Sequence, residues 1–251
     1  MDTGQWGRAE DLLAQAVKTC PANGDAHRAY AEALWNGGQR ERALMQIREA
    51  IRLNDRDPLL FVRAAEMQLA QGRTEFAMQA AQRAVDLDPK LAAAWSVRAR
   101  IHRANQANEE ALADFHRALG YDRGNRALEW EIAELYRQMN QPQRALTALQ
   151  TLADQYPPGE EPQAVLYSQG LALLELGRAN DAAETLAVAA GRGGPNPDVL
   201  YQLAQAQWQA GQAKPALDAA RQALDLSPNH EPSRKLLDEI QFAQRPGLVE
   251  R

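Results

Sequence analysis

The residues of this chain that could do chemistry are few and scattered. There are four histidines and one cysteine, and the sequence contains no His-Glu-x-x-His or Cys-x-x-Cys pair. A metal site needs several such ligands that converge, and His102 and His116 have no further ligand at a suitable spacing. We interpret them as packing or surface side chains. Cys20 has only Lys18 as a neighbouring cation, which predicts a half-buried structural thiol and not a reactive one.

The other candidates for chemistry also have structural explanations. The glycine-rich run at residues 191–195 lacks the lysine of a phosphate-binding loop, so we interpret it as a turn between helices. Glu109 and Glu110 begin a predicted helix, where carboxylates favour the positive end of the helix dipole. We therefore predict no catalytic residue, no metal and no cofactor, and we do not expect this chain to be an enzyme.

Composition narrows the class of protein further. The net charge of −5 argues against nucleic-acid binding, which needs a clustered basic surface. No apolar stretch approaches the ~20 residues that span a bilayer. The richness in Ala, Leu, Gln, Glu and Arg favours helices, and this style of composition also suggests a bacterial source. The compartment stays open: cytoplasmic by default, and periplasmic or membrane-anchored if an N-terminal signal is missing.

A repeat of 34 residues organises most of the chain. Its first marker is a series of turn-forming residues, with one insertion of three residues after the fifth: Gly4, Gly38, Gly72, Gln106, Asn140, Gly177 and Gly211. Alanine stands five residues after every marker, at Ala9, Ala43, Ala77, Ala111, Ala145, Ala182 and Ala216. A second series of small residues, broken once by leucine, comprises Ala16, Ala50, Ala84, Ala118, Leu152, Ala189 and Ala223. Such periodicity is typical of stacked helical hairpins whose close crossings require small side chains.

The pattern resembles the tetratricopeptide repeat, a helix–turn–helix unit. The small residue that this family has at its eighth repeat position is matched by Ala31, Ala65, Ala99, Ala133, Gly170 and Ala204. Its proline near position 32 is matched by Pro21, Pro89, Pro157 and Pro228, whereas Asp55, Arg123 and Gly194 depart from it. The resemblance covers residues 4–228. It implies an all-α fold, a right-handed superhelical α-solenoid.

We predict six repeats at 24–57, 58–91, 92–125, 126–162, 163–196 and 197–230. Residues 1–23 match only a second helix, which is either an N-terminal cap or the end of a repeat whose first part is missing. Without cover, its apolar residues Leu12, Leu13 and Val17 would face water. Residues 231–251 are predicted to form a capping helix and a tail that ends the helix at Pro246. The proline-rich loop at 156–162 either bends the superhelix or serves as a hinge.

The resemblance also implies where a partner would bind. In this family the first helices of the repeats line a concave groove, which repeat positions 2, 5, 9, 12 and 13 face, and we take positions 5, 9 and 12 as its main lining. Carried over residue by residue, this predicts a site formed by Arg28, Trp35, Arg100, Arg103, Trp130, Arg137, Tyr167, Leu171, Leu174, Tyr201 and Trp208. Aromatic and arginine side chains dominate the energetics of protein interfaces. The alternative is that each aromatic side chain only packs between repeats.

The leading functional hypothesis is a protein-interaction module or assembly scaffold that binds an extended peptide or a helix. The expected partner segment carries acidic residues for Arg100, Arg103 and Arg137 next to bulky apolar ones for the aromatic side chains. The carboxylate clamp of some co-chaperones is rejected, because Glu32 would repel a carboxylate. Two alternatives are a non-catalytic accessory domain of a larger enzyme or signalling protein, and a sensor of a small ligand in the aromatic half of the groove.

Overall fold

The computed structural model describes residues 3–244, with side chains described from residue 9 onward. Within that range the chain forms fourteen helices and no strand, so the prediction of an all-α fold is confirmed. The first seven are α1 (Thr3–Thr19), α2 (Gly24–Asn36), α3 (Arg40–Leu53), α4 (Pro58–Leu69), α5 (Thr74–Leu87), α6 (Ala92–Ala104) and α7 (Asn108–Tyr121). The others are α8 (Arg126–Gln138), α9 (Pro142–Ala153), α10 (Gln163–Glu175), α11 (Ala179–Arg192), α12 (Pro197–Gln209), α13 (Ala213–Leu226) and α14 (Glu231–Ala243).

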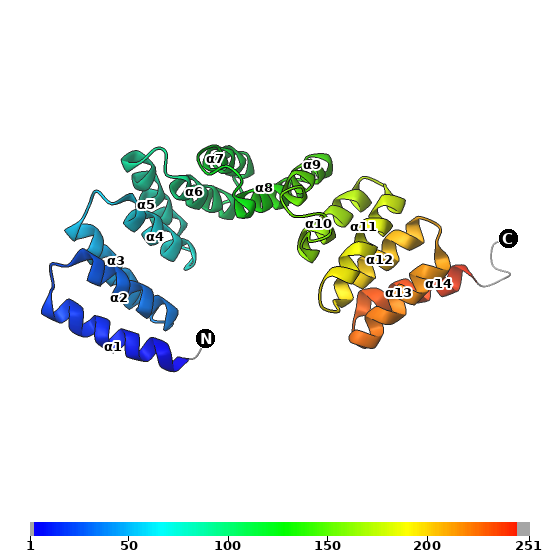
Figure 1. The fold of residues 1–251 in the computed structure, drawn as a ribbon, viewed down its shortest axis with the longest axis horizontal. Helices are drawn as coiled ribbons and strands as arrows, with labels where there is room; N and C mark the ends of the chain where they lie inside the picture. The colour runs from blue at the N-terminus through cyan, green and yellow to red at the C-terminus, as the bar shows by residue number, and fades with distance from the viewer. Residues whose placement is uncertain (1–2, 245–251) are drawn as a thin grey trace. The chain divides into compact units, whose positions relative to one another are not determined.

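The helices belong to two compact units, Met1–Leu128 and Glu129–Arg251. In each unit, neighbouring helices pack as hairpins, such as α2 with α3 and α12 with α13 (Figure 1). First helices of successive hairpins also touch, as α10 touches α12 and α12 touches α14. Each successive pair from α2–α3 to α12–α13 lies within one of the six predicted repeats, whose exact division stays a prediction. The predicted tail around Pro246 lies outside the described residues.

Local sequence signals explain where several helices begin. The side chains of Asn23, Asp57 and Asn196 each accept a hydrogen bond from a backbone N–H in the first turn of the following helix. Such caps satisfy amide groups that have no partner within the helix. Proline stands in the first turn of α4, α9, α12 and α14, where its missing N–H costs no hydrogen bond.

The turns within the hairpins have the left-handed backbone conformation that the repeat predicts. Gly38, Gly72, Gly177 and Gly211 have φ between 71° and 81°. Gln106 and Asn140 occupy the same repeat position with φ of 62° and 55°, although only glycine adopts this region without steric cost. The conformation is therefore imposed by the hairpin. Gly4 differs, because it lies inside α1.

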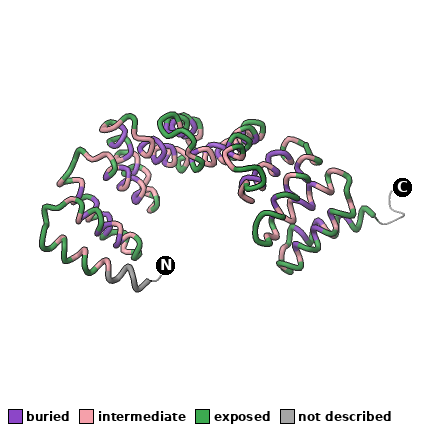
Figure 2. Tube along the Cα trace, viewed as in Figure 1, coloured by how far each residue is buried: buried purple, intermediate pink, exposed green. Residues whose placement is uncertain are grey.

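The core consists of the small residues that the periodicity singles out. The alanines of the 34-residue series from Ala43 onward are fully buried, as are the alanines at the eighth repeat position, and Leu152 is 1% exposed. Figure 2 shows the buried residues on the sides where helices face each other. Helix α1 is the exception, with Ala9 half-buried and Ala16 exposed. On α1, Leu13 and Val17 pack against the core of the first unit, whereas Leu12 is 69% exposed.

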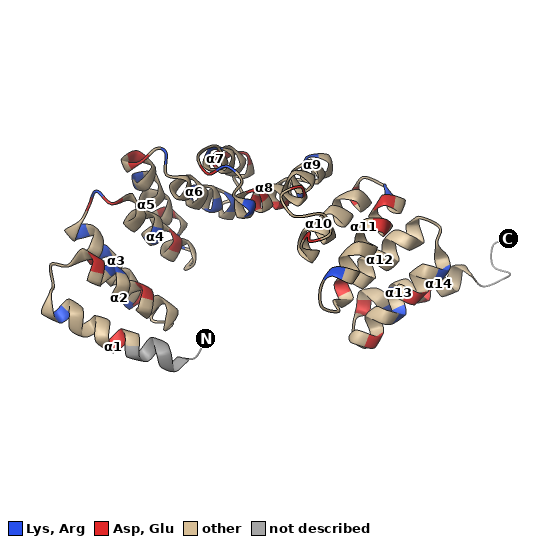
Figure 3. Ribbon diagram, in the orientation of Figure 1, with Lys and Arg blue, Asp and Glu red and all other residues tan. Residues whose placement is uncertain are grey.

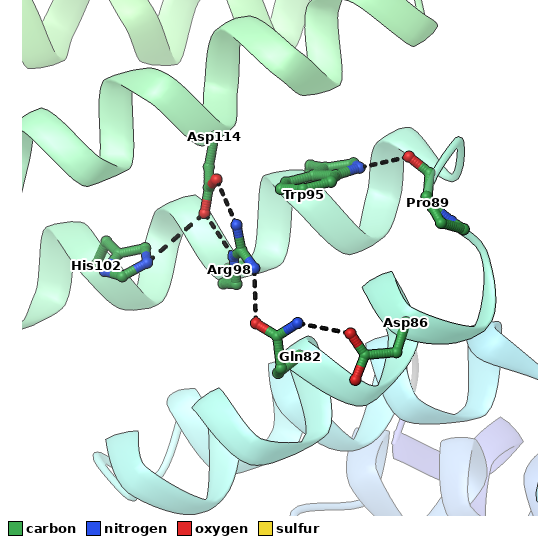
Figure 4. Close-up of polar contacts among 7 residues, drawn as sticks. All are labelled: Gln82, Asp86, Pro89, Trp95, Arg98, His102 and Asp114. Atoms are coloured by element: carbon green, nitrogen blue, oxygen red, sulfur yellow. Dashed lines mark hydrogen bonds and ion pairs between the residues drawn. The ribbon is translucent and has the colours of Figure 1, made fainter.

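A polar network joins three helices of the first unit (Figure 4). The buried carboxylate of Asp114 on α7 accepts two hydrogen bonds of 2.7 Å from Arg98 on α6. Arg98 also donates to Gln82 on α5 at 2.7 Å, and its guanidinium lies 4.5 Å from the centre of the Trp95 ring. The Trp95 indole donates to the backbone carbonyl of Pro89. This network fixes the side chains where α5, α6 and α7 meet.

The Glu161 carboxylate holds the proline-rich loop at 156–162 against helix α11. Glu161 accepts a hydrogen bond from the Gly159 backbone N–H at 3.1 Å and pairs with Arg192 of α11 at 3.2 Å. The backbone hydrogen bonds from its own amide and from Gly159, together with the Arg192 charge, lower the pKa of Glu161. Whether the loop bends the chain or serves as a hinge stays a prediction.

Candidate functional site

The predicted site residues fall into two sets, one in each compact unit. Arg28 and Trp35 lie on α2, and Arg100 and Arg103 lie on α6, all in the first unit. The other seven belong to α8, α10 and α12 in the second unit: Trp130, Arg137, Tyr167, Leu171, Leu174, Tyr201 and Trp208. We call the surface that carries these seven residues the aromatic face.

Every side chain of the aromatic face is half-buried. Tyr167, Leu174, Tyr201 and Trp208 pack against the core of the second unit, while Trp130 packs against a smaller cluster that includes Leu149. The packing interpretation of the aromatic residues therefore describes part of the geometry. Each ring is also partly exposed, and its role in binding a partner stays a prediction.

A hollow of about 460 Å³ lies where α12 meets α14. Tyr201, Gln205 and Trp208 line it from α12, and Glu231, Lys235 and Glu239 are among the residues that line it from α14. The α14 residues are absent from the predicted site, because that helix was interpreted as a cap. The missed signal was the repeat itself: counted from residue 231, Lys235 and Glu239 fall at positions 5 and 9, the positions used for the other first helices.

Carboxylates hold the one arginine of the aromatic face. The Arg137 guanidinium lies 3.5 Å from Glu134 and 3.4 Å from Glu175, and Glu134 accepts a hydrogen bond of 2.8 Å from the Ser168 hydroxyl. Burial raises the pKa of the nearby Tyr167 phenol, and the Asp198 charge adds to this effect while Arg137 opposes it. Most of the positive charge of Arg137 is therefore matched within the second unit.

The corresponding face of the first unit is organised by ion pairs. Arg63 of α4, which sequence reasoning missed, donates to Glu32 at 2.6 Å and to Glu66 at 3.0 Å. Burial alone would lower the pKa of Arg63, but its hydrogen bonds to the two carboxylates raise it. Trp35 lies beneath two guanidinium groups, those of Arg40 at 4.1 Å and Arg63 at 5.7 Å from the ring centre.

The predicted arginines of the first unit have different surroundings. Arg28 is exposed and pairs with Asp25 at 3.3 Å, one turn earlier on the same helix. Arg103 lies with its guanidinium 5.9 Å from the centre of the Phe115 ring, and Arg100 is half-buried. The role of these arginines in binding stays a prediction.

The cysteine and the histidines that were first considered for chemistry lie at different places in the structure. The predicted half-buried state of Cys20 is wrong: α1 ends at Thr19, so the thiol lies in the following turn and is exposed. His102 is half-buried 3.6 Å from the Asp114 carboxylate, and His116 is exposed. Over the described residues, no three side chains of the metal-binding types gather at one place.

None of the helices between residues 3 and 244 is long and apolar enough to cross a membrane.

Comparisons with known proteins agree on one kind of repeat. A profile of the tetratricopeptide repeat family matches residues 1–58, 31–92, 131–197 and 167–231. No curated protein matches the sequence.

Three solved structures with this type of fold resemble the chain. The C-terminal part of a TPR repeat-containing protein from Cytophaga hutchinsonii has a TM-score of 0.76 at 12% identity, over 93% of this chain and 95% of that one. PilF of Pseudomonas aeruginosa has a TM-score of 0.71 at 15% identity, over 86% and 97% of the two chains. YrrB, a TPR protein with an unusual peptide-binding site, has a TM-score of 0.65 at 20% identity, over 75% and 96%. At these identities the likeness concerns the fold.

Proposed function

The chain belongs to the tetratricopeptide repeat family, and we propose that it is a non-catalytic binding module or scaffold that holds a peptide or helix of another protein on its aromatic face. The observation that carries this proposal is the row of half-buried aromatic and leucine side chains on α8, α10 and α12. Rings that are partly fixed by the core lose little freedom when a partner covers them, so more of the burial energy is available for binding. The peptide-binding site of YrrB supports the proposal as an analogy of fold.

The second observation is the low charge of two of the three helices of this face, α10 and α12, in contrast to α8, which carries five charged residues. Helix α10 carries one charged residue, Glu175, and helix α12 carries one, Asp198 (Figure 3). Interface centres are depleted in charge and enriched in aromatic side chains. The surface composition of α10 and α12 fits that pattern.

Photo-crosslinking tests the location of binding. A photoreactive amino acid is placed at Leu171 on the aromatic face or, as the matched control, at Val188, an exposed apolar residue of the adjacent helix α11. After irradiation in the native lysate, we expect one protein to be captured from Leu171 and not from Val188. Capture from Val188 alone would place the partner elsewhere and contradict the proposal.

The partner identified in this way then allows a measurement of affinity. Tyr167→Ala and Trp208→Ala should each weaken binding by ~1–3 kcal/mol, as interface hot spots do. Tyr121→Ala, at an exposed tyrosine of α7, is the control and should bind like the wild type. Thermal unfolding of all three variants separates lost binding from lost structure.

For the first unit, we propose that Arg100 and Arg103 attract acidic residues of a partner. Reversing both to Glu should slow association at low ionic strength and have a much smaller effect at high ionic strength, where salt screens the charges. An equal effect at both ionic strengths would contradict this electrostatic role. The charge of Arg137 is already paired with Glu134 and Glu175.

A further inference from the structure

We propose that the hollow between α12 and α14 binds an arginine or lysine side chain of the partner segment. This inference deepens the proposed function and rests on it, since it assigns the chemistry of one end of the aromatic face. It follows from an internal comparison between the two units, in which a tryptophan and a carboxylate occupy the same repeat positions, once with a bound guanidinium and once without.

The complete arrangement lies between α2 and α4 of the first unit. There the Arg63 guanidinium is held by the Glu32 and Glu66 carboxylates, at 2.6 Å and 3.0 Å, and lies 5.7 Å from the centre of the Trp35 ring. A tryptophan face and carboxylates are together a favourable environment for a guanidinium, which stacks on rings and donates hydrogen bonds in its plane to carboxylates.

The second arrangement, between α12 and α14, has the same repeat positions. Trp208 corresponds to Trp35, and Glu239 corresponds to Glu66. The counterpart of Glu32 is Gln205, which lines the hollow and offers an amide oxygen in place of a carboxylate. The position of Arg63 is taken by Leu236, a buried residue of α14. The tryptophan and one of the two carboxylates are therefore kept, while the chain itself supplies no guanidinium at this position.

The polar contacts in the hollow are consistent with a missing cation. The Trp208 indole donates to Glu239 at 3.2 Å. Lys235 pairs with Glu231 at 3.5 Å, one turn earlier on α14, so their charges offset each other. Among residues 9–244, Glu239 has no cationic partner within ion-pair distance, which leaves the hollow with one unmatched negative charge.

The shape and the walls of the hollow suit a long basic side chain. Its volume of about 460 Å³ exceeds what a single side chain fills, so apolar residues beside the cation can also enter. Tyr201 contributes a second ring to the lining. The chemistry that this site recognises is therefore a guanidinium or ammonium group flanked by apolar side chains.

The test uses the full chain and a displayed library of random 12-residue peptides. We expect the selected peptides to carry an arginine or lysine next to bulky apolar residues. In a synthetic copy of the best arginine peptide, citrulline replaces that arginine, which keeps the shape and removes the charge. We expect this change to weaken binding to the wild type by about tenfold, the order of magnitude of a desolvated cation–π contact with a carboxylate nearby.

Variants of the protein test which carboxylate recognises the positive charge of the peptide. With Glu239→Gln, the preference for arginine over citrulline should fall to less than about threefold, whereas Glu231→Gln should retain most of it. Leu236→Arg should place an internal guanidinium in the hollow and block the arginine peptide. Because Leu236 is buried and its replacement could unfold α14, Glu239→Gln is the deciding variant.

The outcomes separate this inference from the proposed function. If selected peptides bind and lose affinity with Tyr167→Ala, but show no preference for arginine over citrulline, the inference is wrong and the proposed function stands. A preference for arginine that persists in Glu239→Gln also overturns the inference. If no peptide is selected on the aromatic face, both fail.

Discussion

The helix pairs α6–α7 and α10–α11 have equivalent repeat positions but different chemistry at their contacts. In α6–α7, Arg98 and Asp114 form a buried ion pair with two hydrogen bonds of 2.7 Å. In α10–α11 the corresponding residues are Gln169 and Thr185, and the Gln169 amide instead donates to the backbone carbonyl of Leu149. The repeat thus determines where the helices cross, and individual side chains determine how each crossing is stabilised.

The surfaces of the two units differ in the same way. Helices α2, α4 and α6 carry three, two and three charged residues, against one each on α10 and α12, although α8 carries five. In the first unit, ion pairs such as Arg63 with Glu32 satisfy many of these charges internally. In the second unit, half-buried rings remain partly open to solvent. This difference is why we place the peptide or helix on the second unit.

The largest expected effect tests the polar contact of the first unit. Asp114→Ala should destabilise the protein by ~3–5 kcal/mol, because it leaves the largely buried Arg98 guanidinium without its carboxylate. The control is Asp218→Ala in the second unit, where the pair with Arg221 is more than half exposed and should contribute less than ~1 kcal/mol. Chemical denaturation measures both. Equal effects would show that the buried pair is not a distinctive feature of the first unit.

The next prediction concerns a packing rule that the two units share. Ala77→Leu and Ala111→Leu should each destabilise by ~1–3 kcal/mol, because both alanines are fully buried and extra methylene groups create strain. Ala113→Leu, at an exposed position of the same helix as Ala111, should be close to neutral. Denaturation midpoints provide the comparison. Neutral results at both buried positions would mean that these alanines do not lie at close helix crossings.

A pair of glycines sharpens the contrast between the units. A Cβ atom added at Gly170 of α10 would lie 2.4 Å from Cγ of Leu186, whereas one added at Gly120 of α7 would have no atom within 4 Å. Gly120→Ala should stabilise by up to ~1 kcal/mol through helix propensity. Gly170→Ala gains the same propensity but should be net destabilising by up to ~2 kcal/mol because of overpacking. Thermal unfolding should therefore show shifts of opposite sign, and shifts of the same sign would contradict the close contact.

The sequence predicted the positions where close packing allows only a small side chain or one backbone conformation. The alanines at the helix crossings and the left-handed turns follow from sterics, so the repeat alone was sufficient to identify them. Long side chains were harder, because a residue such as Arg63 reaches across helices to partners that spacing along the chain does not reveal. Glu239 was missed for a different reason: the last helix was interpreted as a cap, although its residues continue the repeat positions. Cys20 was placed wrongly because the end of α1 falls one residue before it.

The smallest expected effect compares the two non-glycine residues in left-handed turns, Gln106 in the first unit and Asn140 in the second. A side chain in this conformation costs roughly 1–2 kcal/mol, and asparagine tolerates it better than glutamine because its short amide can bond locally. Glycine removes that cost but adds freedom to the unfolded chain, which offsets about 0.4–1 kcal/mol of the gain. Gln106→Gly should therefore stabilise by up to ~1 kcal/mol, and Asn140→Gly should be nearly neutral. Differential scanning calorimetry of both variants resolves the difference. If Gln106→Gly is destabilising, the Gln106 side chain makes contacts that outweigh its backbone strain, and the turns of the two units are not equivalent.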